Sequence, residues 1–229
     1  MKASVKILLF FCTIGFFAAC NNAPAGEKVD AGEAVETPPT ETASSEAISY
    51  PVNTTSSIIE WTGSKLAGKQ HNGTISLSDG ELTVSEGEVV GGSFTLDMNS
   101  ITDKDMEPGQ GKEKLEGHLK SGDFFEVEKY PTGKFEIAEV SPVEGQEGVT
   151  HNITGNLTLK GITKSVTIPA EINLSEATLE AKTPSFTIDR TEWDIKYNSG
   201  LLGTAKDKII NDEVALRVSL IATPERTIN

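Results

Sequence analysis

The stretch "LTLKGITKSVTI", residues 157–168, decides the fold class of this chain. Apolar and polar residues alternate on both sides of Lys160-Gly161, and a period of two predicts strands that bury one face. A lysine followed by a glycine suits the tight turn that joins two antiparallel strands. The stretch therefore predicts a β-hairpin with one apolar side.

The same alternation recurs over most of the chain after residue 48. Its clearest runs are Phe94–Met98, Phe135–Ile137, Ile172–Leu174, Phe186–Ile188 and Val214–Leu220. Only residues 111–122 have helical spacing, with Leu115 and Leu119 four positions apart. We predict one all-β domain over residues 48–223, an antiparallel barrel or sandwich of about eight main strands with one short helix. Residues 224–229 are predicted to form a C-terminal tail.

The first residues are typical of an export signal. Lys2 and Lys6 precede an apolar run, Ile7–Ala19, that is shorter than the roughly 20 residues of a transmembrane helix. Phe17-Ala18-Ala19-Cys20 resembles a bacterial lipobox, in which the cysteine is acylated and becomes the mature N-terminus. We predict a lipoprotein signal over residues 1–19 and lipid attachment at Cys20. The alternative is ordinary cleavage after Ala25, which gives a soluble periplasmic protein.

The segment after this cysteine, residues 20–47, is predicted to be an acidic disordered tether. Between residues 21 and 47 it carries six acids, one lysine and no aromatic side chain. Such a composition buries too little apolar surface to offset the entropy of ordering the chain. The tether would space the domain from its membrane anchor.

Charge and cysteine content exclude several function classes. The chain carries a formal net charge of −14, which is unfavourable for nucleic-acid binding and for attraction to anionic lipid. Cys12 and Cys20 are its two cysteines. The domain after the signal therefore has no disulfide, no thiol nucleophile and no zinc–thiolate site.

Eight short motifs, in a fixed order, carry a family resemblance. They are IIEWTG (58–63), HNGTI (71–75), GSF (92–94), DMNSI (97–101), HLKSGDFF (118–125), YP (130–131), GNLTLKGITK (155–164) and FTIDRTEW (186–193). Together they resemble the YceI-like family of bacterial envelope proteins over nearly all of residues 48–222. Asp194 stands where the family usually has glycine, which leaves the local turn geometry open.

The resemblance implies a lipocalin-like barrel whose apolar tunnel holds a polyisoprenoid chain of the quinone or polyprenyl type. No catalytic activity is established for the family as a class. We expect non-enzymatic binding, storage or transport of such a lipid, with no cofactor required. The expected location is the cell envelope, as an outer-membrane lipoprotein facing the periplasm or the cell exterior. A homodimer through exposed strand faces stays open.

Burial of a hydrocarbon chain contributes about 0.8 kcal/mol per CH₂, so a long dry cavity can bind it without specific polar contacts. The candidate ligand-binding residues are Trp61, Phe94, Leu96, Met98, Leu119, Phe124, Phe125, Phe135, Ile137, Phe186, Ile188, Arg190 and Trp193. The alternative for the apolar ones is packing in a self-filled barrel, which would make the protein a structural or interaction lipoprotein. For Arg190 it is a structural ion pair with Asp189 or another acid.

Phe124 and Phe125 are adjacent, so their side chains are expected to point to opposite sides. We expect one to anchor the short helix to the barrel wall and the other, Phe125, to face the cavity beneath it.

The sequence predicts no catalytic residue and no metal site. His71, His118 and His151 are isolated, without H-x-H or H-E-x-x-H spacing, and neither G-x-S-x-G nor a P-loop occurs. A metal-dependent enzyme in which the histidines converge is the third alternative. The lysines of the strands and hairpins, Lys134, Lys160 and Lys164, are predicted to be solvated rather than to bind a head group.

Overall fold

The computed structural model describes residues 23–37 and 47–225. The predicted signal and Cys20 lie outside these ranges, as do residues 226–229 of the predicted tail. The strands are β1 (Glu27–Lys28), β2 (Ile48–Pro51), β3 (Ile58–Ser64), β4 (Gln70–Ser85), β5 (Glu88–Asp103), β6 (Thr132–Pro142), β7 (His151–Leu159), β8 (Ile162–Leu174), β9 (Leu179–Lys182), β10 (Phe186–Asp189) and β11 (Glu213–Ala222). The helices are α1 (Lys112–Lys120) and two 3-10 turns, η2 (Arg190–Trp193) and η3 (Gly200–Leu202).

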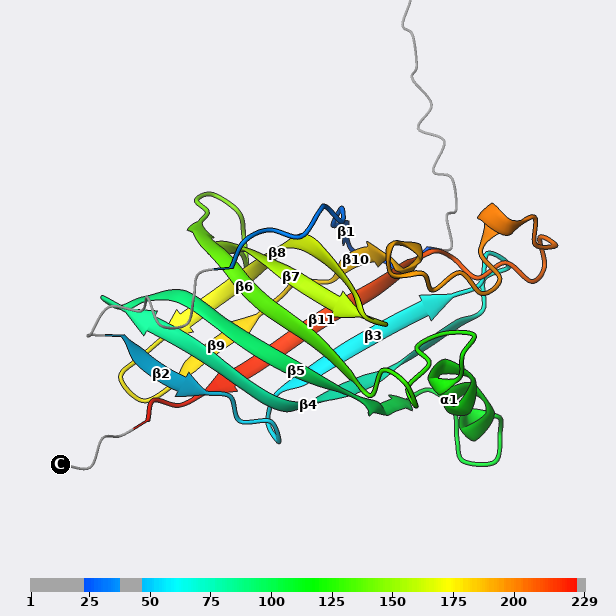
Figure 1. Ribbon diagram of the computed structural model, residues 1–229, viewed down its shortest axis with the longest axis horizontal. Helices are drawn as coiled ribbons and strands as arrows, with labels where there is room; N and C mark the ends of the chain where they lie inside the picture. The colour runs from blue at the N-terminus through cyan, green and yellow to red at the C-terminus, as the bar shows by residue number, and fades with distance from the viewer. Residues whose placement is uncertain (1–22, 38–46, 226–229) are drawn as a thin grey trace, which may run out of the picture.

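Eight of these strands close into an antiparallel barrel (Figure 1). The order is β3-β4-β5-β6-β7-β8-β9-β11, and β11 pairs in turn with β3. The predicted all-β barrel with one short helix is therefore confirmed. Closure gives every barrel strand a neighbour on both sides and places alternate side chains inside.

The predicted hairpin is confirmed, and its turn explains its tightness. Leu159 on β7 pairs with Ile162 on β8, so Lys160 and Gly161 form a two-residue turn. Their φ angles are 50° and 72°, the left-handed values that match the twist of the flanking strands. The inward faces follow the period of two: Phe94, Leu96 and Met98 of β5 are buried.

A proline divides the last wall of the barrel. Both β9 and β10 pair with β11, on either side of residues 183–185. Pro184 has no N–H to donate to the ladder. Thr183 bridges the gap, because its Oγ1 accepts from the Val218 N–H at 2.9 Å and its own N–H donates to the Val218 carbonyl at 3.0 Å.

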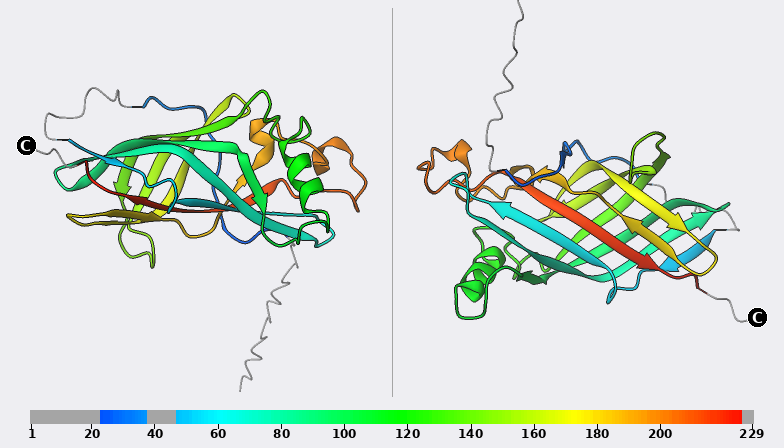
Figure 2. Two further views of the ribbon diagram at one scale, coloured as in Figure 1. Left: turned by 90° about the horizontal axis from the view of Figure 1, so that it is seen from below. Right: turned by 180° about the vertical axis from the view of Figure 1, so that it is seen from behind.

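Helix α1 and the loop around η3 lie at one end of the barrel, with β2 at the other (Figures 1 and 2). Helical spacing predicted this helix over residues 111–122, and the structure places it over residues 112–120. Leu115 and Leu119 pack against the barrel core. In the described part of the chain, no helix has the length and apolar character needed to cross a membrane.

The prediction of a disordered tether is wrong for residues 23–37. β1 pairs in parallel with β10, Gly32 bridges to Ser165 on β8, and the Val29 side chain is buried. Composition alone could not predict this, because main-chain pairing to an open strand edge needs few apolar side chains. The segment is a strap along the outside of the barrel.

Candidate functional site

Two adjoining cavities run through the barrel interior. The deep cavity, of about 110 Å³, is lined by residues that include Leu77, Phe94, Phe135, Phe186 and Leu220. The helix-end cavity, of about 190 Å³, is lined by residues that include Trp61, Met98, Leu119, Phe124 and Phe125. For scale, an apolar cavity of about 150 Å³ stays dry and binds benzene. Both cavities are thus of a size that can admit part of an apolar molecule.

The two cavities share one stretch of wall. Residues that line both are Ile59, Leu96, Leu157, Ile188 and Leu216. Because the shared residues lie between the two spaces, the cavities follow each other from the interior to the end closed by α1. This arrangement suits a long, thin apolar molecule better than a compact one.

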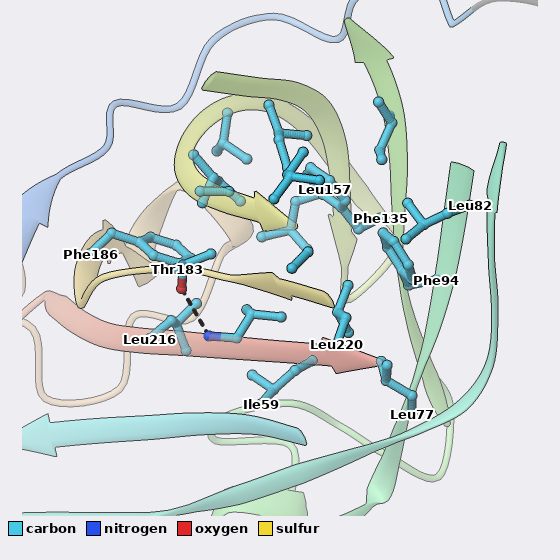
Figure 3. Close-up of a pocket in the computed structure, with 18 of the residues that line it drawn as sticks. Ile59, Leu77, Leu82, Phe94, Phe135, Leu157, Thr183, Phe186, Leu216 and Leu220 are labelled. Atoms are coloured by element: carbon cyan, nitrogen blue, oxygen red, sulfur yellow. Dashed lines mark hydrogen bonds between the residues drawn. The ribbon is translucent and has the colours of Figure 1, made fainter. Parts of the chain in front are cut away.

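The wall of the deep cavity is aliphatic and aromatic on all sides (Figure 3). Phe94 on β5 and Phe135 on β6 are cross-strand partners whose ring centroids lie 6.3 Å apart. Thr183 is a polar member of this wall, but its hydroxyl is engaged with the Val218 N–H. Such a surface can bind hydrocarbon and offers little to a polar group.

Twelve of the thirteen predicted ligand-binding residues line one or both cavities. Trp193 is the exception: it is fully buried outside both, and its indole N–H donates to the Leu157 carbonyl at 3.0 Å. Further wall residues, such as Leu77, Leu82, Leu157 and Leu220, were not predicted individually. The signal for them was the same period-2 alternation, which marks a whole strand face rather than one residue.

Both phenylalanines of the adjacent pair line the helix-end cavity, which was expected for Phe125 but not for Phe124. Phe124 also contacts the His118 ring of α1 edge-on at 5.1 Å and the Tyr197 ring at 5.5 Å. Phe124 and Phe125 follow α1 in a turn, where successive side chains need not alternate as they do on a strand. Phe124 thus anchors the helix and lines the cavity at once.

Arg190 borders the helix-end cavity, but its guanidinium is occupied by the protein. It donates to the carbonyls of Asn211 (3.1 Å), Ile210 (3.1 Å) and Ile195, and to the Asp212 carboxylate at 3.0 Å. Burial lowers the pKa of Arg190, and the charge of Asp212 opposes that shift. The structural alternative is therefore the better description, with Asp212 as the partner in place of Asp189.

Asp194, which departs from the family pattern, adopts a left-handed conformation with φ 56° and ψ 29°. Aspartate tolerates this region better than most residues. A hydrogen bond and ion pair with Lys196 lower the pKa of its carboxyl group. The tight turn after Trp193 is thus kept without glycine.

One polar group of the helix-end cavity lacks a partner. The indole N–H of Trp61 is buried and meets no acceptor among the described residues. An unpaired buried donor is unfavourable by about 1–3 kcal/mol.

The three histidines do not converge. His71 faces Asp105 at 3.0 Å, His118 faces Asp123 at 2.9 Å, and His151 faces Glu88 at 3.8 Å. The three lysines considered for a head group make surface contacts: Lys134 with Glu136, Lys164 with Glu192, and Lys160 with the Asp194 carbonyl. None of these six side chains lines the deep cavity.

Comparison with known proteins gives a consistent match. The model of the YceI-like domain matches residues 50–222. A UPF0312 protein of Pseudomonas aeruginosa (strain LESB58) is 40% identical over 88 residues, which make up 35% of this chain and 44% of that protein. A UPF0312 protein of Pseudomonas putida (strain W619) is 30% identical over 115 residues, or 50% and 56% of the two chains. The chain thus spans about half the length of the curated relatives it matches.

Two solved structures have the same fold. BcnA of Burkholderia cenocepacia has a TM-score of 0.59 at 23% identity, covering 75% of this chain and 99% of that one. A polyisoprenoid binding domain from Saccharophagus degradans has a TM-score of 0.55 at 14% identity, covering 77% and 99%. At these identities the likeness concerns the lipocalin-like barrel alone.

Proposed function

We propose that this chain, which belongs to the YceI-like domain family, binds a long-chain isoprenoid lipid inside its barrel and performs no catalysis on it. The observation that carries the proposal is the pair of adjoining apolar cavities with a shared wall at Leu96, Leu157 and Ile188. Each buried CH₂ contributes about 0.8 kcal/mol, so a chain that extends through both spaces gains more than one confined to either. The Saccharophagus degradans domain with this fold is a polyisoprenoid binding domain, which supports the ligand class.

The unpaired Trp61 N–H favours a ligand that carries a hydrogen-bond acceptor. A lipid with an oxygen at one end, such as a quinone carbonyl or a polyprenyl phosphate, would accept from this donor while its chain fills the rest of the space. A Trp61→Phe variant should then weaken binding of a prenylated quinone, yet leave binding of an oxygen-free prenyl hydrocarbon nearly unchanged. Equal losses for both molecules would exclude the proposed hydrogen bond.

The proposed location is the cell envelope, with the acylated Cys20 as anchor. Cys20 precedes the first described residue by three positions, a distance of at most about 11 Å for an extended chain. With the strap held on the barrel, the barrel itself would lie beside the bilayer in which such lipids reside. Radiolabelled palmitate should enter the protein and be lost in Cys20→Ser. A protein released into the soluble periplasmic fraction would favour the alternative cleavage after Ala25.

The binding function is tested on protein purified from its own host. Native mass spectrometry should show a bound lipid, and delipidated protein should take up a molecule from a quinone or polyprenyl mixture. Protein that carries no lipid and takes up none would exclude the function in favour of a structural or interaction lipoprotein.

A substitution in the cavity separates a tunnel from a filled core. Met98 is buried and lines the helix-end cavity, so Met98→Trp should block uptake with modest loss of stability. In a filled core the same change would cost about 1–3 kcal/mol through overpacking. Val90→Trp is the matched control, since Val90 lies exposed on the same strand, β5. It should leave uptake unchanged.

A further inference from the structure

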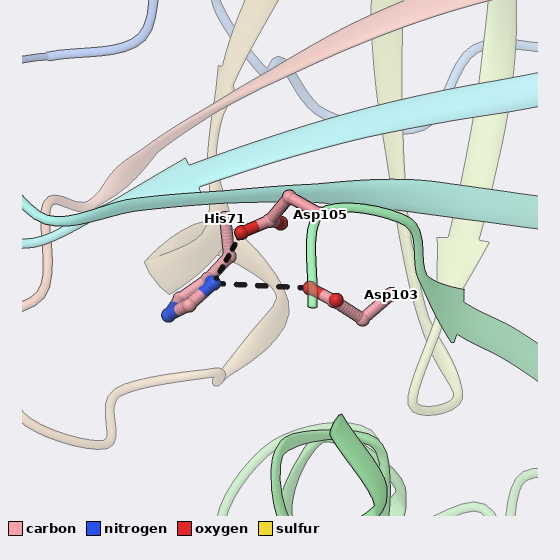
Figure 4. A group of neighbouring side chains, drawn as sticks. All are labelled: His71, Asp103 and Asp105. Atoms are coloured by element: carbon pink, nitrogen blue, oxygen red, sulfur yellow. Dashed lines mark hydrogen bonds and ion pairs between the residues drawn. The ribbon is translucent and has the colours of Figure 1, made fainter. Parts of the chain in front are cut away.

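Three side chains of types that can ligate a metal ion meet where the β4–β5 hairpin opens toward α1 (Figure 4). Gly73 pairs with Asp103, and the Lys104 N–H donates to the Asn72 carbonyl at 2.9 Å, so the same register places His71 opposite Asp105. Asp103 and Asp105 are two positions apart and therefore point to the same side. Their carboxylates and the His71 ring face one another, with one ligand atom of each within 4.8 Å of the others.

Backbone groups hold both carboxylates in place. The Met106 N–H donates to Oδ1 of Asp103 at 2.8 Å, and the Asn72 N–H donates to Oδ1 of Asp105 at 2.7 Å. Each carboxylate thereby turns its second oxygen toward Nδ1 of His71, at 3.8 Å for Asp103 and 3.0 Å for Asp105. Metal ligands are oriented by outer hydrogen bonds of this kind.

The second oxygen of Asp103 is the atom of the cluster that lacks a partner. Asp103 is fully buried, and its Oδ2 accepts no hydrogen bond from any described residue. A proton on Nδ1 of His71 can be donated to Asp105 at 3.0 Å, but 3.8 Å is too long for a hydrogen bond to Asp103. A cation between the three groups would satisfy all of them, and two carboxylates would balance its double charge.

We propose that Nδ1 of His71 and the Oδ2 atoms of Asp103 and Asp105 form a binding site for a divalent transition-metal ion, with Zn²⁺ as the best fit. Bonds of about 2.1 Å at tetrahedral angles require ligand atoms about 3.4 Å apart. Nδ1 of His71 lies 3.8 Å from Oδ2 of Asp103 and 3.0 Å from Oδ2 of Asp105, on either side of that value. An imidazole favours Zn²⁺ over Ca²⁺ and Mg²⁺, which prefer six or more oxygen ligands. Three protein ligands leave a position for water or another oxygen.

The metal site adjoins the proposed lipid-binding space, because His71 also lines the helix-end cavity. The proposal departs from the expectation of no metal site, which considered only clusters of histidines. The sequence features that could have predicted the site are His71 and the pair Asp103-x-Asp105, which strand register brings together.

The test uses the full chain, without an affinity tag and after chelation, titrated with Zn²⁺ alone. We expect one ion per chain by calorimetry and a rise in Tm of about 5–10 °C at 100-fold excess over Kd. Ca²⁺ and Mg²⁺ should have little effect. Asp103→Asn and His71→Asn should each weaken Zn²⁺ binding by at least about 10-fold. Without metal, Asp103→Asn should be about as stable as the parent, because an amide oxygen can still accept from the Met106 N–H while the unpartnered Oδ2 is removed.

His151→Asn is the matched control, because His151 faces only Glu88 and should leave Zn²⁺ affinity unchanged. The chain has three histidines, so imidazole NMR of the unmodified protein adds a readout that needs no variant. Zn²⁺ should shift the ring signals of one histidine, absent from the spectrum of His71→Asn. The proposal is overturned if the parent chain binds no Zn²⁺, if His71→Asn and Asp103→Asn bind it as the parent does, or if the shifted ring belongs to His118 or His151.

Discussion

Asn156 on β7 holds the backbone of Val35 through both halves of its side-chain amide. The Val35 N–H donates to Oδ1 at 3.0 Å, and Nδ2 donates to the Val35 carbonyl at 2.7 Å. The two residues are 121 positions apart in the chain. The amide thus acts like a neighbouring strand and fixes the strap, residues 23–37, to the outer face of the barrel.

Replacing Asn156 with alanine should release the strap while the barrel stays folded. Loss of two part-buried hydrogen bonds costs about 1–3 kcal/mol locally. We expect faster amide exchange at Val35 and faster tryptic cleavage at Lys28, with circular dichroism unchanged. Asn156→Asp should show exchange and cleavage rates between those of the parent chain and the alanine variant, because a carboxylate can accept from the Val35 N–H but cannot donate to its carbonyl. Unchanged exchange at Val35 in the alanine variant would contradict the strap.

Arg190→Lys should destabilise the protein by about 2–4 kcal/mol. A lysine cannot reach three carbonyls and Asp212 together, so several acceptors in a buried or part-buried setting would lose the donor that Arg190 provides. Urea unfolding measures the loss. Arg217→Lys is the control, because its pair with Glu60 is exposed and 3.8 Å long, and should change stability by less than about 0.5 kcal/mol. Similar losses in both variants would show that Arg190 has no structural role of its own.

Gly73→Ala should destabilise the β3–β4 wall severely, by more than about 3 kcal/mol. A Cβ at this position would lie 1.9 Å from the Thr102 carbonyl oxygen and 2.6 Å from the Trp61 ring. Gly63→Ala on β3 is the matched control, because nothing lies within 4 Å of its Cβ position. Thermal unfolding of the two variants tests the difference, and equal Tm values would mean that the close approach is absent in solution.

Glu116→Gln should remove part of the acid sensitivity of the fold. The Thr102 hydroxyl at 2.7 Å, with the Asp103 N–H at 2.9 Å, holds the pKa of Glu116 below its ordinary value. A lowered folded-state pKa gives stability that is present above the unfolded pKa and is lost as pH falls through the folded one.

The stability gap between the parent chain and Glu116→Gln should therefore be largest near neutral pH and shrink toward pH 3. Unfolding free energies across that range measure it. Glu128→Gln removes the same charge at an exposed position and is the control. A gap that stays constant with pH would exclude a role for Glu116 ionisation.

Local pattern was enough to predict the barrel. Alternation along residues 157–168 requires no knowledge of partners, because successive side chains of any strand point to opposite faces. The inward face and most of the cavity wall follow from it, and the spacing of Leu115 and Leu119 predicted the short helix. The place of Trp193 outside both cavities could not be predicted in this way. An aromatic residue at the end of an alternating run has the same pattern whether it lines a cavity or, as here, packs outside it.

The sequence by itself determined which residues can lie inside, since burial of apolar side chains depends on type and period. Only the tertiary structure decided which polar groups meet. Register puts His71 beside Asp103 and Asp105, and the pairing of β10 with β11 brings Arg190 to Asp212. On the outer face of β7, Asn156 meets Val35. These contacts need distances of about 3 Å between residues far apart in the chain, and such distances follow from strand pairing and not from composition.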